Sequence, residues 1–124
     1  MLPALFNIFQ TIVGVTIFAL GMYGNNAADT KLINLRKENA NSKEKYFIPH
    51  GGLYDYISCP NYFCEIFEWI GYAIAGNYNL AGFGFAFMTF ANLAPRALST
   101  HQWYKDYFKD KYPKSRKAII PFIL

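Results

Sequence analysis

The sequence predicts an all-α membrane protein with three transmembrane helices and a C-terminal amphipathic helix. Of its 124 residues, 53% are hydrophobic and only 16% are charged, whereas an ordinary soluble domain carries about 25% charged residues. No charged residue occurs in 1–28 or in 69–95, and about 20 apolar helical residues are enough to cross the hydrocarbon core of a bilayer. All 12 Lys and Arg residues lie in two polar regions, 29–50 and 96–117.

The first predicted transmembrane helix runs from Leu2 to Gly24 and is apolar on all sides, as expected of a helix surrounded by lipid. It is too long for a cleaved signal peptide, and no Lys or Arg precedes it. If the helix continues into the polar region, Asn25, Asp29 and Arg36 fall on one face, because they are spaced by four and seven residues. A functional face and an interfacial helix with solvated side chains both fit this spacing.

The apolar part of 54–95 is long enough for one span or two. Basic loops favour the cytoplasm-like side of a membrane, so the 29–50 loop and the basic C-terminal region should share one side, and an even number of crossings must separate them. We therefore predict helices over roughly 58–76 and 79–95, joined by a turn at Gly76–Asn79. The N-terminus then lies on the opposite face. Gly82 and Gly84 should allow close packing against a neighbouring helix.

Polar residues inside the second predicted helix also share one face. Asn61, Glu65 and Glu68 follow one another at intervals of four and three residues. Carboxylates in an apolar segment are costly to bury and usually face a partner, a cavity or a functional site. Two interpretations stay open: a ligand site, or ion pairs with Arg36 or Arg96 that only hold helices together.

The region from Arg96 to Tyr112 is predicted to be a basic amphipathic helix that ends before Pro113. His101 and Tyr104 share a face of it and could donate hydrogen bonds to a ligand, or could simply belong to an interfacial helix. Arg96, at the membrane exit, suits either bidentate phosphate binding or topological anchoring.

Two classes of partner are not expected. Cys59 and Cys64 are not accompanied by a second Cys or His pair at zinc-like spacing, so we predict buried thiols and no metal site. The net charge of +4 is too small and scattered to indicate nucleic-acid binding.

Several motifs in order resemble the steroid 5-alpha-reductase family, including its polyprenol and very-long-chain enoyl relatives. The resemblance covers about residues 15–124. The matching stretches are GMYGNNAADTKLINLRK (21–37), YFIPHGGLYDYIS (46–58), NYFCEIFEWIGYAIA (61–75), RALSTHQWY (96–104) and KYPKSRKAIIPFIL (111–124).

The resemblance implies NADPH-dependent reduction of a carbon–carbon double bond conjugated to a carbonyl, in a steroid, a polyprenol or an enoyl lipid. Hydride passes to the beta carbon and a proton completes the alpha carbon. Asn and Asp side chains would hold amide and ribose groups, and the arginines would bind phosphates. The cofactor residues that carry over are Asn25, Asp29, Arg36, Tyr46, Asn61, Glu65, Arg96, His101 and Tyr104. The sequence departs from the family at Phe47, where a basic residue is usual.

Family members are about twice this length, so residues 1–124 correspond to the C-terminal half of a larger helical bundle. The earlier helices supply the groups that polarise the substrate carbonyl. We therefore expect membrane lipids as neighbours, and a second chain or a larger membrane complex that supplies the missing helices. The chain is either the cofactor-binding half of a reductase or a non-catalytic membrane subunit derived from one. The resemblance implies the endoplasmic reticulum, and a mitochondrial or other organellar membrane is the alternative.

Overall fold

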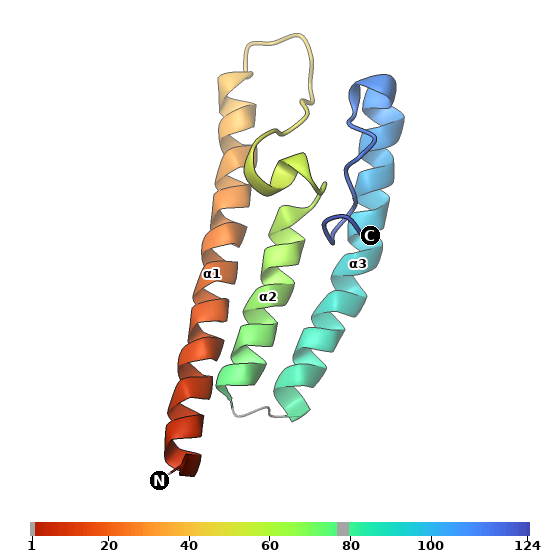
Figure 1. Cartoon of the computed structure of the whole chain (residues 1–124). Helices are drawn as coiled ribbons and strands as arrows, with labels where there is room; N and C mark the ends of the chain where they lie inside the picture. Colours follow the sequence, from red (N-terminus) through yellow and green to blue (C-terminus); the bar gives the residue numbers. More distant parts are fainter. Residues whose placement is uncertain (1, 77–79) are drawn as a thin grey trace.

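The computed structural model describes residues 2–76 and 80–124, and its long elements are three α-helices that lie side by side (Figure 1). They are α1 (Leu2–Glu38), α2 (Pro60–Ala75) and α3 (Leu80–Phe108), with the 3-10 turns η1 (Gly52–Asp55) and η2 (Lys109–Lys111) between and after them. Helix α2 packs against both α1 and α3. The described part of the chain contains no strand, so the all-α prediction is confirmed.

Helix α1 continues far beyond the predicted membrane boundary at Gly24. It has 37 residues, a length of about 55 Å at 1.5 Å per residue. The polar region 29–50 is therefore helical over residues 29–38, which is the continuation that places Asn25, Asp29 and Arg36 on one face. The physical reason is local: no Gly or Pro interrupts the chain between Gly24 and Pro49, so the helix propagates from the apolar segment into the polar one.

Within residues 2–76 and 80–124, one helix, α1, is long and apolar enough to span a membrane. Its best 18-residue window has a mean hydropathy of 1.8, and only 17% of that window is buried within the chain. Side chains such as Leu5 and Phe9 are 59% and 66% exposed, as expected where lipid or further helices surround them. Helix α2, with 16 residues, is about 24 Å long. The second and third spans therefore stay predictions.

The third helix corrects a second prediction. The sequence predicts separate helices over 79–95 and 96–112, but α3 runs without interruption from Leu80 to Phe108. Pro95 lies inside it and cannot donate the backbone hydrogen bond to residue 91. Leu93, Ala94 and Ala97 are buried on either side of the proline, and this packing holds the helix together across the missing bond. The predicted turn at Gly76–Asn79 falls largely on residues 77–79, outside those described.

Glycines bring the helix backbones together. A Cβ atom on Gly71 of α2 would lie 2.5 Å from the Phe18 nitrogen and 2.7 Å from the Gly14 oxygen of α1. On Gly82 of α3 it would lie 2.9 Å from the Ala73 Cα. Close packing at Gly82 is thus confirmed, whereas a Cβ on Gly84 would meet nothing of the described chain within 4 Å, so close packing at Gly84 stays a prediction.

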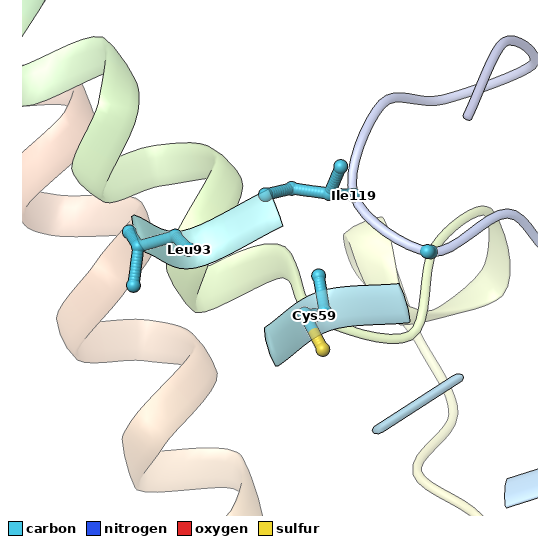
Figure 2. Packing of buried hydrophobic residues seen from close by; sticks show 5 residues of the cluster. Cys59, Leu93 and Ile119 are labelled. Carbon is cyan, nitrogen blue, oxygen red and sulfur yellow. The ribbon is translucent and has the colours of Figure 1, made fainter. Parts of the chain in front are cut away.

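The C-terminal tail folds back along α3 and closes the core (Figure 1). A buried cluster joins the start of α2, the middle of α3 and the tail; it contains Cys59, Leu93, Ala97, Ala118 and Ile119 (Figure 2). The tail also pairs with the segment before α2, because the Ser58 nitrogen donates to the Lys117 oxygen at 2.8 Å and the Lys117 nitrogen donates to the Tyr56 oxygen at 2.9 Å. Both cysteines are free and buried, as predicted.

Gly71→Ala should destabilise the protein, whereas Gly84→Ala should not. The new methyl group at position 71 would push α1 and α2 apart, and overpacking of this kind costs about 1–3 kcal/mol. At position 84 there is open space, and the better helix propensity of Ala is worth up to about 1 kcal/mol. Thermal unfolding in detergent, followed by circular dichroism, compares the two variants. Equal midpoints for both would contradict the packing described here.

Candidate functional site

A polar seam between α1 and α2 brings together residues that the sequence places on two separate helix faces. Asn25 Nδ2 donates to Glu68 Oε1 at 3.2 Å, and Asn61 Nδ2 donates to Asp29 Oδ1 at 3.3 Å. Glu65, about one helical turn from both Asn61 and Glu68 on α2, is half-buried. The seam therefore presents amide donors and carboxylate acceptors at the boundary between apolar and polar parts of the bundle.

The seam also answers the question left open about the two α2 carboxylates. Within the described residues, neither Glu65 nor Glu68 forms an ion pair with Arg36 or Arg96. Glu68 accepts a hydrogen bond from an amide instead. The two carboxylates therefore do not hold the helices together through ion pairs with these arginines.

A cavity of about 180 Å³ lies farther along α1, where three elements meet. Arg36 comes from α1, Tyr46 from the loop after it and Tyr104 from the last turns of α3. The remaining lining residues are Leu32, Leu35, Lys45, Phe47 and Trp103. Three predicted cofactor residues, distant in sequence, thus line one cavity.

Aromatic rings and positive charge characterise this cavity. The Tyr46 ring packs edge-on against Trp103, with ring centroids 5.0 Å apart, and Lys45 Nζ lies 5.5 Å from the Tyr46 ring centroid. A neighbouring cavity of 320 Å³ shares Arg36, Lys45 and Phe47 with the first and adds Lys43. Such a combination suits a ligand that carries both anionic groups and flat rings.

A larger cavity of 640 Å³ continues from Tyr46 and Phe47 toward the end of α3. Another, of 730 Å³, lies between α1 and residues 48–50 and is lined by Lys31, Asn34 and His50 among others. Small-molecule sites in proteins commonly have volumes of about 300–1,000 Å³. The cavities beside the loop after α1 therefore offer room for a ligand that is too large for the Arg36 cavity alone.

His101 and Tyr104 lie on one face of α3, as predicted, but their partners were not predicted. His101 Nδ1 lies 2.6 Å from Ser58 Oγ, and this oxygen lies 2.5 Å from the Tyr112 hydroxyl. The Tyr104 ring stacks on Tyr112, with centroids 5.1 Å apart. Ser58, His101 and Tyr112 are far apart in the sequence and form no recognisable motif, so the sequence alone did not predict this cluster.

Burial keeps both predicted residues neutral. Burial, together with the neighbouring Tyr112 phenol, raises the pKa of Tyr104 to about 12. Burial also lowers the pKa of His101 below its usual value, and the positive charges of Lys105 and Lys117 act in the same direction. Near neutral pH, both side chains therefore act as neutral hydrogen-bonding groups.

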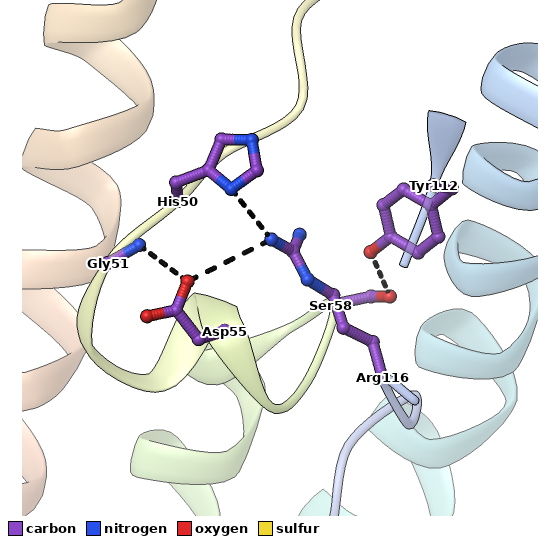
Figure 3. A network of polar contacts seen from close by, with 6 residues as sticks. All are labelled: His50, Gly51, Asp55, Ser58, Tyr112 and Arg116. Atoms are coloured by element: carbon purple, nitrogen blue, oxygen red, sulfur yellow. Dashed lines mark hydrogen bonds and ion pairs between the residues drawn. The ribbon is translucent and has the colours of Figure 1, made fainter. Parts of the chain in front are cut away.

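Arg116 is a buried cation that residue-level reasoning missed. Its side chain is 1% exposed, and Nη2 lies 3.2 Å from His50 Nδ1 and 4.0 Å from Asp55 Oδ1 (Figure 3). The guanidinium lies 5.2 Å from the Tyr112 ring centroid, while Nε and Nη1 have no hydrogen-bond partner among the described residues. The only signal in the sequence was its place in the C-terminal motif. Arg116 ties the tail to the loop before α2.

Arg96 lies apart from the other predicted residues. It is exposed on α3, just after Pro95. In the part of the chain that the structure describes, its side chain makes no hydrogen bond or ion pair. The structure thus gathers Asn25, Asp29, Asn61 and Glu65 in the seam, and Arg36, Tyr46 and Tyr104 around one cavity, but leaves Arg96 outside both groups.

Comparison with known proteins finds relatives over nearly the whole chain. Residues 3–124 match the sequence profile of a family described as 3-oxo-5-alpha-steroid 4-dehydrogenase. The chain is 46% identical over 115 residues to steroid 5-alpha-reductase DET2 of Arabidopsis thaliana, which covers 93% of this chain and 42% of the relative. It is 45% identical over 113 residues to 3-oxo-5-alpha-steroid 4-dehydrogenase 1 of Rattus norvegicus, which covers 91% of this chain and 42% of the relative. The chain thus spans less than half the length of these relatives.

Arg116→Ala should destabilise the protein by about 1–3 kcal/mol, because it removes a buried hydrogen bond and the packing of the tail. Lys114→Ala, a matched loss of one positive charge at an exposed position of the same tail, should change stability by no more than about 0.5 kcal/mol. Chemical unfolding in detergent measures both. If the two variants prove equally stable, Arg116 does not anchor the tail.

Stability should fall as the pH drops below about 6.5, the usual pKa of His. The pKa of His101 is lower in the folded chain, so the unfolded chain binds more protons there, and acid favours unfolding. The contribution of His101 to the free energy of unfolding is complete above pH 6.5. It is lost progressively as the pH falls from 6.5 toward the pKa of His101 in the folded chain. Thermal unfolding between pH 7.5 and 5 should show a smaller pH dependence in His101→Gln. An unchanged dependence in that variant would contradict the assignment.

Proposed function

Since this chain belongs to the 3-oxo-5-alpha-steroid 4-dehydrogenase family, we propose that it is the NADPH-binding half of a membrane reductase. The enzyme reduces a carbon–carbon double bond conjugated to a carbonyl. The observation that carries the proposal is the cavity lined by Arg36, Tyr46 and Tyr104, because it combines a positively charged guanidinium with aromatic rings. Reductases of this family are NADPH-dependent.

The residues present fit this cofactor. NADPH carries several phosphate charges, and the planar guanidinium of Arg36 can donate two parallel hydrogen bonds to a phosphate. Lys45, beside it, adds a second positive charge to the same cavity. Tyr46 and Tyr104 provide aromatic faces for a flat ring. When bound, NADPH supplies the hydride that reduces the double bond.

The seam suits the uncharged parts of a dinucleotide. Asp29 accepts hydrogen bonds, as a ribose hydroxyl requires, and the amides of Asn25 and Asn61 both donate and accept, as a carboxamide requires. Asn61 already bonds to Asp29, and Asn25 to Glu68, across α1 and α2, so these side chains are held in place before a ligand arrives. We assign to these residues binding and orientation, and to His101 and Tyr104 the role of neutral hydrogen-bond donors.

The substrate belongs to a lipid class. The exposed side chains of α1 and α3 are strongly apolar, with Phe9 66% and Phe87 70% exposed, which suits a steroid, polyprenol or enoyl lipid that arrives through the bilayer. The same faces suit membrane lipids and the helices of a second chain or a larger complex, which would supply the groups that polarise the substrate carbonyl. We place the protein in the endoplasmic reticulum, with another organellar membrane as the alternative.

Arg36→Ala should weaken NADPH binding about 10-fold or more, because a hydrogen bond between charged groups is worth about 1.5–3 kcal/mol and 1.4 kcal/mol is a factor of ten. Lys37→Ala is the matched control: it removes the next positive charge on α1, at an exposed position, and should change binding by less than about threefold. The affinity is measured by NADPH fluorescence on the purified membrane complex.

The same titration separates the reductase from the non-catalytic alternative. Binding to the parent protein that depends on Arg36 but not on Lys37 supports the cofactor-binding half. A parent complex that binds no NADPH would make the chain a membrane subunit that has lost the activity of its family. Equal losses in both variants would place the cofactor phosphates elsewhere.

A further inference from the structure

A short chain of hydrogen bonds connects the tail, the loop before α2 and α3. The Tyr112 hydroxyl lies 2.5 Å from Ser58 Oγ (Figure 3), and Ser58 Oγ lies 2.6 Å from His101 Nδ1. Ser58 is 4% exposed and Tyr112 is 3% exposed. Solvent therefore has little access to either hydroxyl, and the protons must be shared within the cluster.

Counting protons fixes the direction of this chain. A phenol has a single proton to donate, and a buried hydroxyl without an acceptor is costly. Ser58 Oγ is the only described hydrogen-bond partner of the Tyr112 hydroxyl, so Tyr112 donates to Ser58. The Ser58 proton is then free to be donated to His101 Nδ1. The reverse order would leave the buried Tyr112 proton without an acceptor.

We infer that Ser58 and Tyr112 are positioning residues that hold the neutral His101 ring in the tautomer with its proton on Nε2. A nitrogen that accepts a hydrogen bond carries no proton, and a neutral imidazole then carries its single proton on the other nitrogen. No described residue forms a hydrogen bond with Nε2. His101 therefore offers an Nε2 proton to an acceptor oxygen of the bound dinucleotide. This step rests on the proposed function, while the tautomer does not.

The backbone makes the arrangement rigid. The Ser58 nitrogen donates to the Lys117 oxygen at 2.8 Å, and the adjacent Ile57 and Lys117 form a parallel bridge. The Tyr112 ring stacks on the Tyr104 ring and also lies 5.2 Å from the Arg116 guanidinium. The lowered pKa of His101 keeps its ring neutral near pH 7, which a single tautomer requires. Rigid supporting groups of this kind set the orientation of a histidine ring.

Nitrogen-15 NMR on the full chain in lipid nanodiscs tests the tautomer directly. The chain has two histidines, His50 and His101, and a His101→Gln variant assigns the signals. Correlations of the ring nitrogens with the ring protons should show His101 protonated on Nε2 alone in the parent and in Ser58→Thr, which keeps the hydroxyl. Ser58→Ala and Tyr112→Phe should each introduce a measurable population protonated on Nδ1.

A parent protein with the proton on Nδ1 would overturn the inference, and so would a tautomer unaffected by both variants. Circular dichroism controls for unfolding, and Ser58→Thr controls for loss of packing. In NADPH titrations, Ser58→Ala should weaken binding about fivefold, the equivalent of about 1 kcal/mol, whereas Ser58→Thr should stay within about twofold of the parent. If the parent binds no NADPH, the proposed function fails while the NMR result still decides the tautomer.

Discussion

The pairing of the C-terminal tail with the segment before α2 is the constraint on which the rest of the structure depends. Backbone hydrogen bonds between residues 56–59 and 117–118 fix the start of α2, and Arg116 attaches the same tail to His50 and Asp55. Both ends of the long loop after α1 are thereby held, one by the helix and the other by the tail. Without the tail, Tyr112 could not reach Ser58, and His101 would lose its partner.

Close helix contacts and the polar seam act together. Small residues at Gly14, Gly21 and Gly71 bring α1 and α2 near enough for the short side chains of Asn25 and Asn61 to bond across the interface. Arg36 lies two helical turns beyond Asp29 on α1, where the helices leave the apolar region. There it lines a cavity together with residues of the loop and of the end of α3. A gradient thus runs along the bundle from apolar surface, through paired amides and carboxylates, to exposed positive charge.

Local periodicity made part of this arrangement predictable. Asn25, Asp29 and Arg36 share a face because helical spacing alone determines it, and the seam confirms that Asn61 and Glu68 face the same interface. Contacts made by the tail and the loop could not be predicted in this way, because helical periodicity relates only residues that are close in sequence. Tyr46 contacts Trp103, which lies 57 residues later in the sequence, and Ser58 meets Tyr112 only after the tail folds back. The predicted boundary between two helices at residues 95 and 96, where the charged residues resume, was wrong because buried neighbours hold α3 together across Pro95.

A structure of the native membrane complex determined with NADPH tests the central claim most directly. The account predicts density for a dinucleotide against Arg36, Tyr46 and Tyr104, reaching the seam at Asp29 and Asn61, with helices of a second chain over the exposed apolar faces of α1 and α3. An empty or lipid-filled cavity, with the chain packed against unrelated subunits, would contradict it.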